Sequence, residues 1–117
     1  MRGRWFLLGA LALLASFSAP AAARAELALP DGFAEIPIAE GLADPTALAY
    51  APDGRMFIAE KAGRVRVVSP AGALAATPVI DIRDHVATAG DRGLLGIAVD
   101  AAFATNGFVY LLYVYDE

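Results

Sequence analysis

The chain has 117 residues, a formal net charge of −4, a hydrophobic content of 58% and no cysteine. The absence of cysteine excludes a disulfide-stabilised scaffold and a thiolate metal site. An acidic balance without a cluster of basic residues argues against nucleic acids and anionic membrane surfaces as partners.

The first 25 residues have the pattern of a secretory signal peptide. Two arginines precede an apolar run from Trp5 to Phe17, and an Ala-Arg-Ala site ends at Ala25. An uncleaved anchor helix is the alternative, but the apolar run is shorter than the ~20 residues that a membrane span needs. Cleavage after Ala25 leaves 92 residues with six basic and thirteen acidic side chains, a net charge of −7. We therefore expect export to a bacterial periplasm or the medium, without stable membrane association after cleavage.

Beyond the signal peptide, short strands separated by turns recur, and helix signals are nearly absent. Residues 26–45 are expected to form an extended N-terminal segment. Pro-Asp-Gly at 52–54 predicts a tight turn, because it joins a fixed φ, a side chain that bonds its own backbone and a residue that tolerates positive φ. Similar turns divide residues 46–83 into an antiparallel meander, with strands at 46–51, 55–60 and 64–68 and a fourth from Thr77. Arg64 and Arg66 share one face of the third strand, which we expect to be solvated.

The pattern then repeats. The stretch LAYAPDGRMFIAE (48–60) is echoed by IAVDAAFATNGFVYLLYV (97–114), with Ala49 and Ala98 in register. A four-stranded unit that recurs at roughly 40–50 residues is typical of a β-propeller blade, although a β-sandwich has similar spacing.

The predicted fold class is all-β, a partial β-propeller over residues 46–117. The first blade is expected at about 46–83, and a second blade is expected to start at about 94–117. The stretch YLLYVY (110–115) is expected to be core. Because an unpaired apolar strand at a terminus promotes aggregation, we expect the chain to be the front part of a longer protein.

Three stretches carry a family resemblance: PTALAYAPDGRMFIAEKAGRVRVV, TPVIDIRD and GDRGLLGIAVDAAFATNGFVYLLYVY. They resemble the start of the glucose/sorbosone dehydrogenase family, and the resemblance covers nearly all of residues 41–115. The pairing of DRGLLGIA with F-x-T-N-G-x-V-Y is the more specific part, whereas the Pro-Asp-Gly turn occurs in many propellers.

The resemblance implies a secreted six-bladed propeller that holds pyrroloquinoline quinone (PQQ) and Ca²⁺ across its top. The chain would supply the first one and a half blades, after the signal-peptide helix. In such enzymes Ca²⁺ polarises the quinone, a histidine takes the hydroxyl proton of the sugar, and hydride passes to the quinone. That histidine and the main PQQ ligands belong to a later part of the family pattern, so we assign no catalytic residue and no metal ligand in this chain.

One loop matches a site position of the family. Gly90 and Gly93 flank Asp91 and Arg92, directly ahead of the apolar stretch LLGIAV. In the glucose dehydrogenases a Gln from this loop reaches the active-site rim, and Asp91 stands in its place as an acidic acceptor. We therefore predict that Asp91 and Arg92 contact substrate or cofactor at the rim. The alternative is a plain turn between blades, with Arg92 paired to a neighbouring carboxylate.

The remaining polar residues are expected to be structural. His85 is the one histidine and can titrate near neutral pH, but a solvated loop position is the simpler interpretation. Asp81, Asp84 and Asp91 do not have the spacing of an EF-hand, and bound Ca²⁺ takes about six to eight oxygen ligands. We therefore predict no metal site among them.

Together with the signal peptide, the resemblance implies that the parent protein is an exported quinoprotein oxidoreductase that oxidises an aldose or related sugar at a CH–OH group. The electron acceptor stays open. The alternative is a non-catalytic secreted propeller that binds carbohydrate or protein, and a third option is a structural role in which this chain assembles with other blades. Residues 26–117 by themselves are expected to lack dehydrogenase activity and to be marginally stable, because the base is absent and sheet edges are unpaired.

Overall fold

The computed structural model describes residues 28–117, so the predicted signal peptide at 1–25 lies outside the described part of the chain. Residues 28–34 belong to a separate N-terminal unit, in which the N–H of Phe33 donates to the carbonyl of Pro30. None of the helices in the described part has the length and apolarity that crossing a membrane requires.

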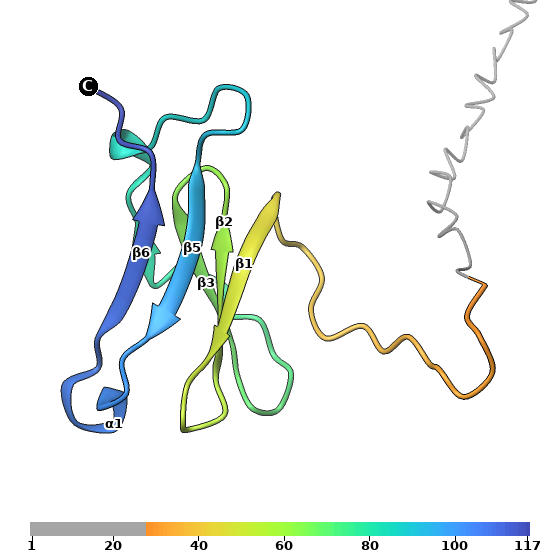
Figure 1. The fold of residues 1–117 in the computed structure, drawn as a ribbon. Helices are drawn as coiled ribbons and strands as arrows, with labels where there is room; N and C mark the ends of the chain where they lie inside the picture. Colours follow the sequence, from red (N-terminus) through yellow and green to blue (C-terminus); the bar gives the residue numbers. More distant parts are fainter. Residues whose placement is uncertain (1–27) are drawn as a thin grey trace, which may run out of the picture. The chain divides into compact units, whose positions relative to one another are not determined.

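The unit from Glu35 to Glu117 is built from antiparallel strands, as Figure 1 shows. Four strands form one sheet in the order β1-β2-β3-β4, and two more form a second sheet, β5-β6. The strands are β1 (Pro45–Tyr50), β2 (Met56–Glu60), β3 (Arg64–Val68), β4 (Ile80–Asp81), β5 (Leu94–Val99) and β6 (Val109–Tyr113). Helical structure in residues 28–117 is limited to a 3₁₀ turn, η1 (Arg83–His85), and to α1 (Phe103–Asn106). The all-β class is confirmed.

The predicted four-stranded meander is also confirmed. The bounds of the first two strands shift by one residue, and the largest difference is at the last strand. Strand β4 begins at Ile80 rather than at Thr77. Pro78 has no N–H to donate to a ladder, so regular pairing cannot extend through it. The N–H of Val79 still donates to the carbonyl of Val65, which keeps this segment against β3.

The first sheet is covered on both faces, which explains why β2 is buried along its whole length. Alternate side chains of a strand point to opposite faces. Phe57 and Ala59 therefore pack towards the second sheet, in one cluster with Leu94. Met56 and Ile58 pack on the other face against the segment before β1 and the loop after β3. A strand in this position stabilises both clusters at once.

Strand β6 is only half in the core, so the expectation for YLLYVY is wrong in part. Val109 and Leu111 pack towards the first sheet. Tyr110 and Leu112 point the other way and are 55% and 69% exposed. The alternation of a strand sends every second side chain to the face that no described element covers.

The internal repeat is visible in the registers of the two hairpins. The pairing of β1 with β2 is irregular between Pro45 and Ala47. The pairing of β5 with β6 is irregular between Leu94 and Gly96, which lie 49 positions after Pro45 and Ala47. Such a bulge bends a strand and increases its twist. The two hairpins therefore bend at corresponding points, and β5 lies beside β1 (Figure 1). The longer turn of the second copy contains α1, which ends at Gly107 in the left-handed conformation.

The β2–β3 turn packs tightly against the segment that leads to β5. Gly63 has a φ of +106°, and a Cβ added there would lie 2.8 Å from Val86 Cγ2 and 3.2 Å from the Cα of Arg83. Its carbonyl accepts a hydrogen bond from the N–H of Ile82. Both the backbone conformation and the available space therefore require glycine at this position.

Gly63→Ala is expected to lower the free energy of unfolding by about 2–4 kcal/mol, because left-handed strain adds to overpacking. Gly72→Ala is the matched control, since Gly72 has a φ of +84° but an added Cβ meets nothing within 4 Å. We expect a loss of about 1 kcal/mol there, from strain alone. Urea unfolding followed by circular dichroism measures both, and equal losses would contradict the close approach at Gly63.

Candidate functional site

The connection from η1 to β5 carries the two rim residues predicted from the sequence. It lies at the same end of the sheets as the β2–β3 turn, as Figure 1 shows. Asp91 and Arg92 are both exposed. Asp91 makes no hydrogen bond or ion pair with any residue of the described part. Its carboxylate is therefore open to a ligand.

Arg92 bonds within its own loop rather than to a carboxylate. Its backbone N–H and its Nε both donate to the carbonyl of Ala89, at 3.3 and 3.1 Å. The pairing of Arg92 with a neighbouring acid, which we considered from the sequence, is absent among residues 28–117. The terminal guanidinium nitrogens keep their donors for solvent or a ligand.

The first sheet fixes both ends of this loop. Lys61, in the β2–β3 turn, donates from Nζ to the carbonyl of Gly90 at 2.6 Å. The N–H of Leu94 donates to the carbonyl of Lys61 at 2.9 Å. The carbonyl of Leu94 accepts a hydrogen bond of 2.6 Å from Thr46 Oγ1. The loop is thus held by residues from two other elements of the chain.

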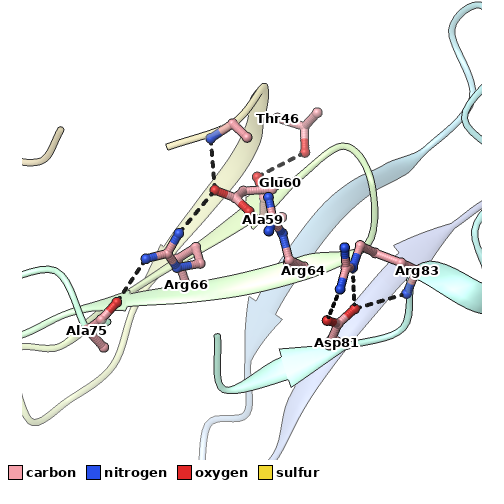
Figure 2. A network of polar contacts seen from close by, with 9 residues as sticks. Thr46, Ala59, Glu60, Arg64, Arg66, Ala75, Asp81 and Arg83 are labelled. Carbon is pink, nitrogen blue, oxygen red and sulfur yellow. Dashed lines mark hydrogen bonds and ion pairs between the residues drawn. The ribbon is translucent and has the colours of Figure 1, made fainter. Parts of the chain in front are cut away.

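A buried carboxylate, that of Glu60, ends β2 and directly precedes Lys61 in the chain (Figure 2). The side chain of Glu60 is 0% exposed. Its Oε1 accepts a 2.8 Å hydrogen bond from the N–H of Ala43 and lies 3.6 Å from Arg66 Nη1. Its Oε2 lies 2.8 Å from Arg64 Nε, but the N–H is not directed at the oxygen, so this contact is an ion pair without a hydrogen bond.

The expectation that Arg64 and Arg66 form a solvated face is therefore wrong. The β2–β3 register places Arg64 opposite Glu60 and Arg66 opposite Ile58, so both guanidinium groups reach the buried carboxylate. Arg66 also donates to the carbonyl of Ala75 at 2.8 Å (Figure 2). The buried carboxylate therefore ties β3 and the segment before β1 to the end of β2.

The other polar residues that the sequence raised do not form a site. His85 is exposed and stacks on Tyr115, with ring centroids 6.2 Å apart and an interplanar angle of 11°. Asp81 pairs with Arg83 at 2.8 Å, and hydrogen bonding from that guanidinium lowers the pKa of Asp81. Residues 28–117 contain no group of three or more His, Cys, Asp or Glu that could hold a metal ion.

A second polar cluster, which the sequence interpretation missed, orders the turn between β5 and β6. Asp100 Oδ1 accepts hydrogen bonds from the N–H of Ala102 and from Asn106 Nδ2, at 2.7 and 3.0 Å. Its Oδ2 accepts the hydroxyl of Tyr110 at 2.5 Å. The Tyr110 hydroxyl, with the other two donors, lowers the pKa of Asp100, and the same bond raises the pKa of Tyr110. The signal was present in the F-x-T-N-G-x-V-Y motif, whose Asn and Tyr meet at this carboxylate.

An apolar groove of about 600 Å³ lies on the face of the first sheet that points away from the second. It is lined mainly by apolar side chains of β1, β2 and the preceding segment, among them Ile36, Ile38, Leu42, Leu48 and Met56. It has no titratable side chain, so it offers a packing surface and no chemistry.

A family model describes this combination of sheets and loop. The model for glucose/sorbosone dehydrogenases matches residues 42–117, which include all six strands and Asp91. The chain belongs to the glucose/sorbosone dehydrogenase family. The resemblance seen in the sequence is therefore confirmed.

Two solved structures are similar to 63% of the chain, each with a TM-score of 0.55. One is an oxidoreductase from Thermus thermophilus, described as a glucose dehydrogenase, with 38% identity. The other is a glucose dehydrogenase with 30% identity. The chain spans 21% of each of these proteins.

Curated relatives give a second comparison. Hedgehog-interacting protein from mouse is 35% identical over 86 residues, and its human counterpart is 34% identical over the same length, each covering 68% of this chain. An uncharacterised protein of Synechocystis sp. is 35% identical over 86 residues and covers 67% of the chain. The chain spans 12% of the two Hedgehog-interacting proteins and 20% of the Synechocystis protein.

Glu60→Gln is expected to lower the free energy of unfolding by about 3 kcal/mol, because it leaves two largely buried guanidinium groups without their counter-charge. Asp53→Asn is the control, since it removes an ion pair of similar length, 2.7 Å to Arg55, from the exposed surface. Exposed pairs contribute little, so this variant is expected to unfold almost like the wild type. Denaturant unfolding of the two variants measures this difference. Similar losses of unfolding free energy in both would contradict the prediction that burial makes the Glu60 pairs more important than an exposed pair.

Tyr110→Phe is expected to lower the thermal midpoint at pH 7, because Asp100 loses its strongest hydrogen-bond donor. The folded pKa of Asp100 lies below its ordinary 3.8, so the contribution is present above that value and is lost as the pH falls through the folded pKa. The wild type and the variant should therefore converge in strong acid. Tyr113→Phe, which removes a hydroxyl outside this cluster, is the control. A difference that persists below the folded pKa would refute the linkage.

Proposed function

We propose that the whole protein is an exported sugar dehydrogenase that oxidises an aldose or related sugar at a CH–OH group, with PQQ and Ca²⁺. The observation that carries this proposal is the family match over residues 42–117. Two glucose dehydrogenases among the similar structures support it. Because the chain spans 21% of each, the activity is proposed for the whole protein and not for this segment.

The architecture proposed for the whole protein is a six-bladed propeller, with the two sheets as its first blade and the start of its second. The apolar faces support this arrangement. One sheet presents the groove that includes Ile36 and Leu48, and the other presents Tyr110 and Leu112. Adjacent blades of a propeller cover such faces on both sides. The predicted signal peptide supports a periplasmic or secreted location.

The described residues do not by themselves supply a Ca²⁺ site. They hold no group of three or more metal-ligating side chains, and a Ca²⁺ ion takes about six to eight oxygens. The proposal therefore assigns the calcium ion, the proton acceptor and the main ligands of the quinone to parts of the protein outside these residues. When bound, the quinone supplies the hydride acceptor.

The role proposed for this chain is to bind and orient the sugar at the rim through Asp91. A carboxylate is a strong acceptor for hydroxyl donors, which a sugar offers in pairs. Asp91 is exposed and has no partner in the described part of the chain, so accepting those donors breaks no internal bond. Arg92 supplies neighbouring donors suited to a cofactor that bears carboxylates.

A second candidate function is a secreted propeller that binds a ligand without oxidising it. The observation that favours it is the 35% identity to Hedgehog-interacting protein, whose name describes a binding role. The two candidates differ in what the whole protein does with PQQ, Ca²⁺ and a sugar. Only the dehydrogenase transfers electrons to a dye.

The test uses the complete protein expressed from the reading frame that contains this chain, loaded with PQQ and Ca²⁺. We expect aldose-dependent dye reduction that chelation abolishes and added Ca²⁺ restores. Asp91→Ala is expected to raise KM about tenfold with little change in kcat. The variant loses roughly one charged hydrogen bond to the sugar, which is made equally in the ground state and the transition state.

Asp84→Ala is the control, because Asp84 is an exposed carboxylate outside the loop and is expected to leave KM unchanged. Carbohydrate or protein binding without dye reduction in the loaded protein would favour the binding propeller. Dye reduction that Asp91→Ala leaves unchanged would keep the enzyme and refute the rim contact.

A further inference from the structure

Lys61, in the β2–β3 turn of the first sheet, contacts the loop before β5 that carries Asp91. Its Nζ donates to the carbonyl of Gly90 at 2.6 Å, a hydrogen bond between residues 29 positions apart in the chain. Gly90 immediately precedes Asp91, so this bond fixes the peptide that leads into the acidic residue.

The same lysine also fixes the far side of the loop. Its carbonyl accepts the N–H of Leu94 at 2.9 Å. The backbone of Gly93 passes so close that an added Cβ would lie 2.7 Å from Lys61 Cγ and 2.8 Å from the Lys61 carbonyl oxygen. One residue therefore clamps the chain both before and after the pair Asp91–Arg92.

Between these clamps the loop has little other support. In the described part of the chain Asp91 has no partner, and Arg92 bonds only to the carbonyl of Ala89 within the same loop. A glycine-bounded loop has many accessible conformations, and ordering it on binding would cost conformational entropy. A clamp that orders it beforehand raises affinity without touching the ligand.

We propose that Lys61 is the positioning residue for Asp91, and that its ammonium group holds the carboxylate in the orientation that receives the sugar hydroxyls. This inference rests on the proposed function in one respect, that Asp91 faces the sugar. Lys61 acts through the loop, so its effect on the reaction should depend on the presence of the Asp91 carboxylate.

The first measurement follows the loop and not the reaction. Lys61→Met keeps the aliphatic stem that packs at Gly93 and removes the ammonium donor. In the complete protein, we expect hydrogen exchange of the Arg92 amide, which donates to the carbonyl of Ala89, to rise about fivefold to tenfold, as the loss of one charged hydrogen bond implies. Lys61→Arg, which keeps a cationic donor, should restore most of the protection. Arg83→Met, which removes an exposed cation bonded to Asp81, is the control and should leave the loop unchanged.

The second measurement is a double-mutant cycle on sugar oxidation. Lys61→Met is expected to raise KM about fivefold with kcat nearly constant, and to cause no further rise in the Asp91→Ala background, because coupled residues are not additive. An equal rise in both backgrounds would overturn the inference, since Lys61 would then act independently of Asp91. Unchanged exchange of the Arg92 amide would overturn it as well.

The two measurements separate this inference from the proposed function. If the loaded wild-type protein oxidises no sugar, the proposed function fails, and hydrogen exchange still decides whether Lys61 positions the loop. If sugars are oxidised and exchange is unchanged in Lys61→Met, the function stands and the positioning role is refuted.

Discussion

The two sheets are joined at Leu94. How they pack together depends on the hydrogen bonds that the backbone N–H and carbonyl of this residue make. Its side chain is 0% exposed, so its backbone polar groups are out of reach of water. Its N–H donates to the Lys61 carbonyl and its carbonyl accepts the Thr46 hydroxyl, so both partners come from the first sheet. An unpaired backbone group in such a place costs free energy comparable to a lost hydrogen bond. The second sheet is therefore fixed to the first at its own first residue.

That junction requires small residues around it. Gly93 passes against Lys61 with no room for a Cβ, and Ala47 in β1 packs into the cluster that includes Leu94. The alternating alanines of β1 are explained by this close approach of β5, which larger side chains would prevent. The loop that bears Asp91 ends at this junction, so the packing that joins the sheets also sets where the loop emerges.

The sequence predicted the strands well and the polar contacts less well, for a physical reason. Turns such as Pro-Asp-Gly are local signals, so the meander and the repeat could be read from short stretches. The pairing of Arg64 with Glu60 depends on the register across the β2–β3 turn, and burial of that pair depends on what covers the sheet. Neither is local information. The position of Asp91 was predicted from a family motif, whereas the clamp from Lys61 joins residues far apart in sequence.

The buried ion network and the loop clamp are adjacent in the chain, and this order has a consequence. Glu60 is locked by Ala43 and two arginines, and Lys61 follows it directly. Because Glu60 is buried and held in place, the backbone of the next residue has a defined conformation. The side chain of Lys61 is thereby directed to the carbonyl of Gly90. Asp91, by contrast, is exposed and has no hydrogen bond or ion pair in the described part of the chain, so it can change without disturbing the core. In the proposed role of this loop, the side chain at position 91 can vary with the ligand while the fold keeps the loop in place.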